Sequence, residues 1–546
     1  MDFRDRATEH VGRRPFLRTV GAAGAFGLAG CVSEVGDEPE LDTAAEEMIY
    51  EGLQAEGVDP PVETTIYANA ENDERLRWAQ LVQHALNATD LFDVGFDSLE
   101  WSSYEQLCLN MADNEENALI TLDISGGWDP HSYVNLLFHS AHQAPNGFNF
   151  AHYADDRVDE LIDSGLAEAD PEKRVELYKE LQERLVQQAP ISIVRFGEAV
   201  TVYRTDAVNE WRQYPLPGSE YEAVYAPYAN TSLEHADGEA ELVGDLPATV
   251  SNPDPVRMND TTSTMATSLL YEGLLAVDFD GTPRPQLATD WEQLDETTYR
   301  FELRDGVEFH NGETLTAEHV HASFERYEGT PRAADVYDWY EGVDIVDDTE
   351  LEVHLSRSYG PLETRVGVPI VPLAASDGEI DLSEKPIGTG PYRFDEREYG
   401  EYWRLERFDD HWFDGDGQVP DQPPVAQLTL RVMSEPSARQ AALETGEIDL
   451  TTGMPSGSVD RFDDDSDYGV DRTVAGSVDF LAYPLYREPF TNVDVRRGID
   501  RLLPRERIIE DVYAGHGTPG YTAIPPLMAE FADPEFEASI VDEYIE

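Results

Sequence analysis

Apolar residues recur along this chain with two spacings that alternate. Some runs place apolar residues three and four positions apart, as in a helix with one buried face, and shorter runs are almost continuously apolar. The predicted helices cover residues 44–57, 75–86, 171–188 and 505–513, and the predicted strands cover 62–68, 96–101, 119–122 and 191–203. Because helices and strands alternate in both halves, the pattern predicts an α/β fold with two lobes.

The amino-terminal residues follow a different pattern. Arg13 and Arg14 precede a Gly/Ala-rich run from Thr19 to Gly30, and Cys31 follows directly. This layout is typical of a twin-arginine export signal that ends in a lipobox. A buried first helix is the alternative, but each glycine in its interior would cost about 1 kcal/mol relative to alanine. We therefore expect export by the twin-arginine route and lipid attachment at Cys31, on the outer face of the cytoplasmic membrane.

Charge narrows the class of partner. The chain has 111 acidic and 38 basic residues and a net charge of −73, which excludes nucleic acid as a partner. The carboxylates are interleaved with aromatic and β-branched residues, as on a folded surface and unlike a disordered acidic tail. At molar salt the Debye length falls to about 3 Å, so their mutual repulsion is screened. The composition predicts a protein of an extreme halophile, an archaeon, that faces brine.

Cysteine content limits how the fold is stabilised. Cys31 and Cys108 are the two cysteines of the sequence, and lipidation of the first leaves no partner for a disulfide. Stability must then come from the burial of apolar side chains, for which 546 residues suffice to form two sizeable lobes.

A series of motifs in the second half is the most specific feature of the chain. They are Tyr271-Glu272-Gly273-Leu274, Trp291, the run Phe301 to Phe309, Ile387-Gly388-Thr389-Gly390-Pro391-Tyr392 and Gly446-Glu447-Ile448-Asp449. In this order they resemble the family 5 solute-binding proteins of ABC importers, the dipeptide, oligopeptide and nickel class. The resemblance implies a periplasmic-binding-protein-like fold with a hinge and an interlobe ligand cleft. It also implies a monomer without cofactor or catalytic residues, which delivers a small solute, an oligopeptide for instance, to permease subunits with cytoplasmic ATPases.

The order of the segments departs from this family. The helix at 44–57, the motif Trp128-Asp129-Pro130, the helix at 171–188 and the strand at 191–203 resemble segments that the family places after the motifs above. The chain therefore resembles a circular permutation, although an accidental fusion of two half-genes predicts the same sequence. The expected organisation is a signal (1–31), a tether (32–41), the second lobe (42–190), strands that return to the first lobe (191–214), a linker (215–240), the first lobe (241–515) and a crossover that completes the second lobe (516–546).

Candidate ligand-binding residues follow from the same resemblance. Peptide binders of the family usually carry an Asp three residues before the Asp-Pro pair, where this chain has Gly126, and Asp123 is the candidate substitute. Trp128 is either a stacking platform in the cleft or a core aromatic residue. The remaining candidates are Asp129, Tyr483, Asn259 and Thr261, the last two of which fit a solvated turn equally well.

Metal, nucleotide and enzyme sites are less well supported. His131, His139, His142 and His152 crowd after the Asp-Pro pair, but no Cys or Glu at close spacing completes a ligand set, and we predict no metal site. The stretch 515–520 fits G-x-G-x-x-G, yet it follows a helix and contains Pro519, which favours an interlobe loop. The sequence lacks the hydrolase, metalloprotease and P-loop motifs. A secreted hydrolase and a binding module for a membrane sensor are the alternatives.

Overall fold

The computed structural model describes residues 42–113, 117–235, 241–532 and 534–541. Arg13, Arg14 and Cys31 lie outside the described residues. Residues 41–546 form one compact unit. Among the described residues, no helix has both the length and the apolar character needed to cross a bilayer.

The second lobe is built on parallel strands that are buried on both faces. Its strands are β1 (Val62–Asn69), β2 (Phe92–Leu99) and β3 (Ala118–Ser125). Strand β1 pairs in parallel with β2 along its whole length and with β3 over Thr65–Tyr67. Ile66 and Leu119 point to one core and Tyr67 and Ile120 to another, which is the alternation expected of a sheet covered on both sides.

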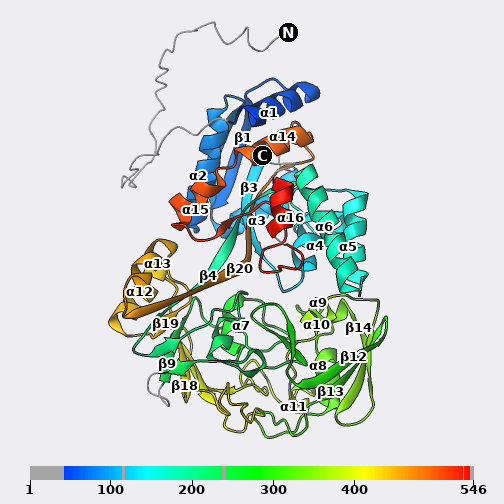
Figure 1. Ribbon diagram of the computed structural model, residues 1–546, viewed down its shortest axis with the longest axis vertical. Coiled ribbons are helices and arrows are strands. Elements are labelled where there is room, and N and C mark those ends of the chain that lie inside the picture. The colour runs from blue at the N-terminus through cyan, green and yellow to red at the C-terminus, as the bar shows by residue number, and fades with distance from the viewer. Residues whose placement is uncertain (1–41, 114–116, 236–240, 533, 542–546) are drawn as a thin grey trace. The chain divides into compact units, whose positions relative to one another are not determined.

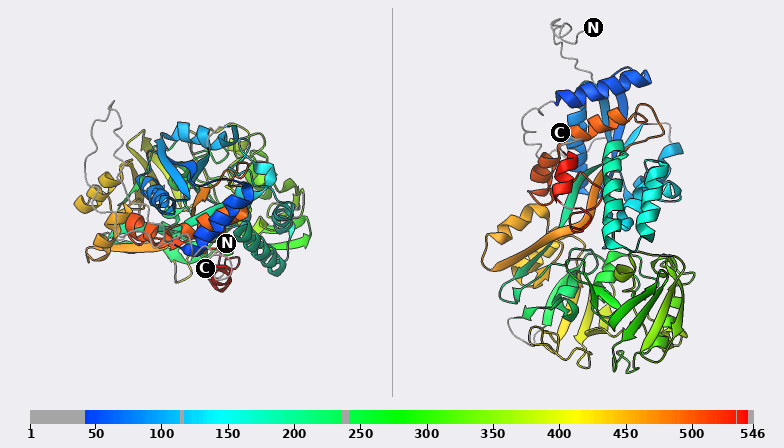
Figure 2. Two further views of the ribbon diagram at one scale, coloured as in Figure 1. Left: turned by 90° about the horizontal axis from the view of Figure 1, so that it is seen from above. Right: turned by 45° about the vertical axis from the view of Figure 1, so that its right-hand side comes forward.

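Helices cover both faces of this sheet (Figures 1 and 2). On one face lie α1 (Thr43–Glu56), α2 (Asp73–Ala88), α14 (Val493–Leu502) and α15 (Arg505–Tyr513). The other face carries α3 (Trp101–Leu109), α4 (His131–Phe138), α5 (Asp156–Ala167), α6 (Pro171–Gln188) and α16 (Pro534–Ile540). Asp170 caps the amino end of α6 and Pro171 occupies its first turn, which is why the predicted start at 171 is correct.

The first lobe contains two antiparallel sheets. One has the order β12-β13-β15-β14 and the other β16-β17-β18-β9, in which only the last pair is parallel. Their strands are β9 (Glu241–Leu246), β12 (Ala288–Asp295), β13 (Thr298–Leu303), β14 (Tyr340–Ile345), β15 (Glu350–Leu355), β16 (Tyr392–Glu398), β17 (Tyr402–Arg407) and β18 (Gln427–Val432). Both sheets contribute to one large core.

Short elements complete the first lobe. The helices are α7 (Thr261–Thr267), α8 (Ala317–Glu325), α9 (Ala334–Tyr337), α10 (Leu362–Arg365), α11 (Leu373–Ser376), α12 (Pro436–Thr445) and α13 (Ser456–Asp463). The short strands are β5 (Val208–Glu210), β6 (Tyr225–Ala226), β7 (Thr231–Ser232), β8 (Glu234–His235), β10 (Leu275–Val277), β11 (Pro283–Pro285) and β19 (Leu450–Thr451). Thr316 caps α8 together with His319, which forms a capping box.

Two long strands connect the lobes. Strands β4 (Ile191–Arg204) and β20 (Tyr468–Ala482) pair with each other antiparallel, and β20 also pairs with β3. The register of the β4–β20 pair shifts between Val474 and Val478, which places a bulge at the middle of the connection. Strand β21 (Thr518–Pro519) joins β4 at Arg195 and Phe196, so the loop after α15 lies beside the same crossing.

Two predicted segments pack differently from the expected organisation. Helices α14 and α15 were assigned to the first lobe by the boundary at 515, but they pack on α1 and α2 of the second lobe, because Val495 and Ile499 bury against Ile49 and Leu53. Residues 219–235, within the predicted linker, form short turns and strands, and the Tyr221 side chain is fully buried in the core of the first lobe.

Candidate functional site

The carboxyl ends of the parallel strands define one edge of the second lobe. Strand β1 leads to Asn72, whose side chain caps α2, β2 leads to α3, and β3 ends at Ser125 before Gly126 and Gly127. In open α/β sheets, ligands bind outside the carboxyl ends of the strands. This edge faces the crossing of β4 and β20 and the first lobe, and the structure has a cleft here.

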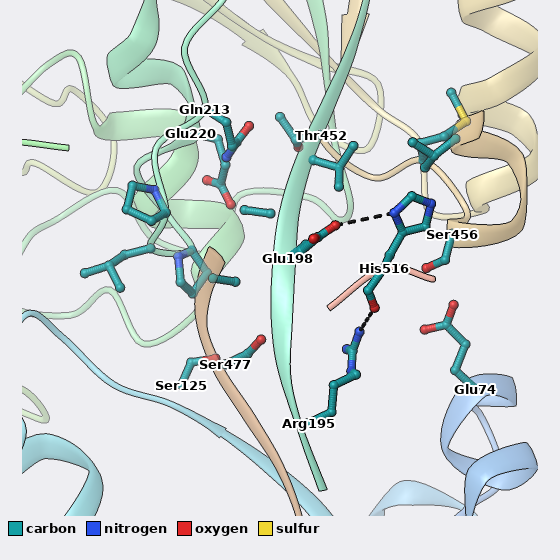
Figure 3. Close-up of a pocket in the computed structure, with 18 residues that line it drawn as sticks. Glu74, Ser125, Arg195, Glu198, Gln213, Glu220, Thr452, Ser456, Ser477 and His516 are labelled. Atoms are coloured by element: carbon teal, nitrogen blue, oxygen red, sulfur yellow. Dashed lines mark hydrogen bonds and ion pairs between the residues drawn. The ribbon is translucent and has the colours of Figure 1, made fainter. Parts of the chain in front are cut away.

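One end of the cleft is rich in glutamate and is shown in Figure 3. It is a hollow of about 300 Å³ between the second lobe, the crossing strands and the first lobe. Its lining includes Glu74 at the start of α2, Glu198 on β4, Ser477 on β20, Glu220, His516 and Ser125. We call this hollow the glutamate end.

The positive charge of Arg195 at the glutamate end is already paired. Its Nε lies 2.9 Å from Oδ2 of Asp479, and its Nη1 donates to the carbonyl oxygen of His516 at 3.0 Å. The guanidinium also stacks on Tyr513, 3.4 Å from the ring centroid. Arg195 therefore holds the β21 loop against β4.

Glu198 and His516 have unused hydrogen-bonding capacity. Oε2 of Glu198 lies 3.4 Å from Nδ1 of His516, close enough for an ion pair, yet this oxygen accepts no hydrogen bond in the described structure. Nε2 of His516 lies 3.5 Å from Asp460 and also has no hydrogen-bond partner there. His516 is only 7% exposed. A buried polar atom without a hydrogen-bond partner is costly, and both residues line the hollow of the glutamate end.

Glu220 adds a carboxyl group whose pKa is raised. It accepts a hydrogen bond from the Gly218 backbone N–H at 2.9 Å. Burial raises the pKa of Glu220 to about 7, because the charged form loses hydration. This carboxyl group therefore changes its charge near neutral pH.

The other end of the cleft carries arginines. It is a hollow of about 510 Å³ that includes Trp128, Thr261, Arg332, Asp335 and Arg365 in its lining. Ser125, Leu216 and Pro217 line both hollows, so the two are parts of one cleft. Arg332 pairs with Asp335 at 2.6 Å, and Arg365 bonds to Tyr359, with the charge of Asp129 helping to raise the pKa of Arg365. We call this hollow the arginine end.

Trp128 bridges the two lobes at the arginine end. Its Nε1 donates to the hydroxyl oxygen of Tyr214 at 2.8 Å, and the Tyr214 hydroxyl donates to the carbonyl oxygen of Val277 at 3.0 Å. The two rings meet edge to face, with centroids 6.0 Å apart. Gly281 lies so close that a Cβ there would be 2.9 Å from the Trp128 ring. Trp128 thus lines the cleft and fixes the approach of the first lobe.

Comparison with known proteins addresses the second half of the chain. Residues 282–541 match the model of the bacterial extracellular solute-binding proteins, family 5, middle region. The matched region is a little under half of the 546 residues. Among curated proteins, the glutathione-binding protein GsiB of Escherichia coli O1:K1 is 23% identical over 297 residues, which are 53% of this chain and 57% of that protein. GsiB of Salmonella paratyphi A is 24% identical over 284 residues, 50% of this chain and 54% of that protein.

Solved structures match over a similar fraction of the chain. DppA from Helicobacter pylori in complex with the peptide STSA is 25% identical with a TM-score of 0.38, over 42% of this chain and 49% of that one. NikZ from Campylobacter jejuni in complex with Ni(L-His) is 21% identical with a TM-score of 0.37, over 41% and 45%. The chain spans about half the length of the curated relatives it matches.

The two aspartates assigned from family 5 spacing both pair with arginines. Asp129 is 4% exposed and lies 2.6 Å from Nη2 of Arg174, and it accepts the backbone N–H of His131 at 2.9 Å. Asp123 pairs with Arg75 of α2, and its side chain is 46% exposed. In this structure Asp129 holds α4 to α6, and Asp123 holds β3 to α2.

The other assigned positions differ in their access to the cleft. Thr261 is exposed and lines the arginine end, whereas Asn259 is exposed nearby and does not belong to that lining. Tyr483 is fully buried in the core between the sheet, α1 and α14, and its hydroxyl group pairs with that of Ser192. Tyr483 therefore does not reach the cleft.

The four histidines do not form a cluster of metal ligands. Within the described parts of the chain, no three His, Cys, Asp or Glu side chains come together as metal ligands. Burial lowers the pKa of His131 to about 4, His139 lies 3.5 Å from Asp163, and the ring of His142 meets that of His139 at 5.8 Å. His152 packs on Tyr486.

Sequence reasoning missed the main charged groups of the cleft. Glu198 lies within a predicted strand, and His516 lies in the glycine-rich loop. The loop's two positive-φ glycines, Gly515 and Gly517, indicated a sharp turn, but not which strand it would join. Only the pairing of β21 with β4 brings His516 to Glu198.

Proposed function

We propose that this protein is the solute-binding component of an ABC importer and that its ligand is a zwitterion of peptide type. The observation that carries the proposal is one cleft between two lobes, with Glu74, Glu198 and Glu220 at one end and, at the other, Arg332 and Arg365 beside Glu222 and Asp335. The family model that matches residues 282–541 describes extracellular solute-binding proteins, and this match supports the same role.

The charges of the cleft indicate the orientation of the ligand. Glu74, Glu198 and Glu220 line the glutamate end, where Arg195 is compensated by Asp479. An ammonium group placed there would donate charge-assisted hydrogen bonds to these carboxylates, which contribute about 1.5–3 kcal/mol each. A carboxylate at the arginine end would meet the fork of Arg365. Oε2 of Glu198, which accepts no hydrogen bond in the described structure, takes the role that the family gives to an Asp at the position of Gly126.

Binding measurements with short peptides test this proposal. Isothermal titration in molar KCl would compare glutathione, triglycine, N-acetyl-triglycine and triglycine amide. Glutathione is included because the GsiB relatives are named for binding it. We expect triglycine to bind at least about tenfold more tightly than either blocked form, because each block removes one charge. Equal affinity for triglycine and its two blocked forms would contradict a zwitterionic ligand. Absence of binding by all of them would also contradict it.

The cleft also provides a mechanism for delivery. The ligand contacts both lobes, so it binds the closed form better than the open form and shifts the population towards closure. The closed form would then dock on the permease. The same titrations, followed by mass spectrometry of the peptide, separate this reading from a secreted hydrolase, since a hydrolase would return cleaved peptide.

Export and anchoring are proposed from the amino-terminal motif. Cys31→Ala should release the protein into the medium, because no acyl chains would attach to it. Arg13→Lys combined with Arg14→Lys should leave an uncleaved precursor inside the cell. Unchanged membrane association of the Cys31 variant in a fractionation experiment would contradict the lipid anchor.

Adaptation to brine is proposed from the net charge of −73. Salt screens the repulsion among carboxylates, so the thermal midpoint should rise steeply between dilute buffer and molar KCl. A flat response to salt would contradict this reading.

The circular permutation is proposed from the order of the segments. Alignments to curated relatives cover about half of both chains, as expected when the other half lies in a different order. Packing supports it as well: Asp42, which caps α1, pairs with Arg501 of α14 at 3.0 Å, and Gln182 of α6 donates to the carbonyl oxygen of Phe531 at 2.8 Å. Asp42 and the residues before α16 therefore lie in one lobe.

A rearranged chain tests the permutation. It joins Glu546 to Asp42 through a few Gly/Ser residues and opens near Gly238, a position outside the described residues. Because closure entropy changes slowly with loop length, stability should differ by no more than about 1–2 kcal/mol, with unchanged ligand affinity. Failure of the rearranged chain to fold in high salt would contradict the permutation.

A further inference from the structure

The second lobe contains an apolar hollow that the charged cleft does not include. Its volume is about 290 Å³, and it lies between α3, α4, the end of β3 and the segment around Phe148. Its inner wall includes Cys108, Leu122, Leu137, Phe150 and Phe480, each of which is at most 7% exposed. The protein could have filled this space with side chains, since interiors are normally packed to high density.

Two aromatic side chains at the mouth of the hollow are unusually exposed. Trp101 is 49% exposed and Phe148 is 51% exposed, and both line the hollow. Few large apolar side chains of the described structure are exposed to this degree, and two of them flank one opening. Apolar surface left open around a hollow marks a place where an apolar group binds.

The hollow and the cleft share one lining residue. Ser125, the last residue of β3, lines the hollow, the glutamate end and the arginine end alike. Trp101 begins α3 directly after β2, so it lies at the same carboxyl edge of the sheet. A ligand that spans the two charged ends passes Ser125 and can extend a substituent into the hollow.

The polar groups of the hollow indicate which substituent fits. Glu105, Asp123 and Ser125 lie in its lining, and Asp123 is paired with Arg75. These carboxylates would repel an anionic head group, which disfavours a fatty acid. The apolar inner wall would leave a charged substituent without partners. A neutral apolar group remains, and the volume exceeds the roughly 150 Å³ of an engineered cavity that holds benzene.

We infer that this hollow is a specificity subsite for a large apolar side chain of the bound solute. The inference rests on the proposed function and deepens it: the preferred ligand is a zwitterion that carries an aromatic or branched aliphatic side chain. Charge at the two ends of the cleft orients the ligand, and the hollow selects among side chains.

Tripeptides that differ in one side chain test the subsite. Triglycine would be compared by titration in molar KCl with the three tripeptides in which one glycine is replaced by phenylalanine. One of the three should bind about tenfold to a hundredfold more tightly than triglycine, because the hollow removes a phenyl ring from water. The position of that residue would identify the part of the ligand that passes Ser125.

A filled hollow provides the decisive variant. Leu136 of α4 is half-buried and lines the hollow but neither end of the cleft, so Leu136→Trp should fill the space without disturbing the fold. In this variant, triglycine and the tightest of the phenylalanine tripeptides should have nearly the same dissociation constant. Tyr399→Ala, at a side chain that is 81% exposed and outside the hollow, is the control and should keep the difference between the two dissociation constants.

A neutral fluorescent probe separates failure of the subsite from failure of the proposed ligand class. N-phenyl-1-naphthylamine fluoresces in apolar surroundings and needs neither charged end. Its binding to the native protein and its loss in Leu136→Trp would support the subsite even if no tripeptide binds, an outcome that overturns only the peptide-like ligand. Equal affinity for all tripeptides, or undiminished binding of the probe to Leu136→Trp, would overturn the subsite.

Discussion

Two regions near the cleft hold their carboxylates in opposite states. In the segment 123–129, Asp123 and Asp129 are each paired with an arginine of the same lobe. Where β4 meets the β21 loop, Oε2 of Glu198 and Nε2 of His516 have no hydrogen-bond partner in the described structure. The first region uses its charges to hold helices to the sheet. The second keeps unsatisfied groups beside the cleft, where only a ligand or water can satisfy them.

This difference teaches that position relative to a motif does not determine the role of a charge. Asp129 was assigned to the ligand because it follows Trp128 in the Asp-Pro motif, but the buried Arg174 already neutralises it. Glu198 was not assigned at all, although it lies at the crossing of the lobes. The four predictions below test whether the two regions differ in energy as they do in geometry.

Asp129→Ala should have the largest effect, a loss of about 3–5 kcal/mol in the free energy of unfolding. The carboxylate and the guanidinium of Arg174 are both buried, so removing one leaves a buried charge without a partner. Denaturant unfolding in molar KCl measures the change. Arg174→Ala should cost a similar amount, and the double variant should cost less than the sum. Reduced ligand affinity in Asp129→Asn at unchanged stability would instead assign Asp129 to the ligand.

Glu198→Gln should abolish the preference for a free amino group. In the native protein, triglycine should bind about tenfold or more tightly than N-acetyl-triglycine, and the two affinities should become similar in the variant. A disturbed contact with His516 would weaken both ligands equally and leave their ratio unchanged. Glu401→Gln is the matched control, because Glu401 is exposed and does not line the cleft. A preference that survives in Glu198→Gln would place the ligand ammonium elsewhere.

Glu220→Gln should change how stability depends on pH. Burial raises the pKa of Glu220 from 4.5 to about 7, so between these values the folded state holds a proton that the unfolded state releases. Stability from this group is therefore greatest below pH 4.5 and is lost as pH rises towards 7. Glu220→Gln should be more stable than the native protein by up to about 3 kcal/mol at pH 8 and equal to it near pH 4. A difference that does not vary with pH would show that the carboxyl group is well hydrated.

Local structure was largely predictable from the sequence, because it depends on nearby residues. The helices at 171–188 and 505–513 have the predicted bounds, and strand β1 ends one residue after the predicted 62–68. Predicted strand 96–101 was shifted, since β2 covers Phe92–Leu99 and Trp101 begins α3. Glu100 caps that helix by accepting hydrogen bonds from the backbone N–H groups of Ser102 and Ser103. A search for runs of apolar residues does not detect this capping signal.

The cleft was less predictable, because it depends on long-range pairing. Trp128 and Thr261 do line the arginine end, although they are 133 positions apart in the sequence. The glutamate end joins α2, β4, β20 and the β21 loop, which no local pattern relates. A sequence with 111 acidic residues offers many candidate carboxylates, and only packing separates those that are paired from those that are not.

Asp123→Asn should have the smallest effect, a change below about 1 kcal/mol in the free energy of unfolding. Asp123 pairs with an arginine as Asp129 does, but its side chain is 46% exposed, so water already stabilises the charge and salt screens the pair. Denaturant unfolding of Asp123→Asn and Asp129→Asn compares two aspartate–arginine pairs of the same lobe. Titration with triglycine completes the test, because Asp123 was the candidate substitute for the family aspartate. Since its carboxylate faces Arg75, the affinity should stay within about twofold of the native value. A tenfold loss of affinity with unchanged stability would show that the ligand ammonium displaces Arg75 from Asp123. The two regions would then differ in whether a ligand can replace the partner of a carboxylate, and not in whether the carboxylate has a partner.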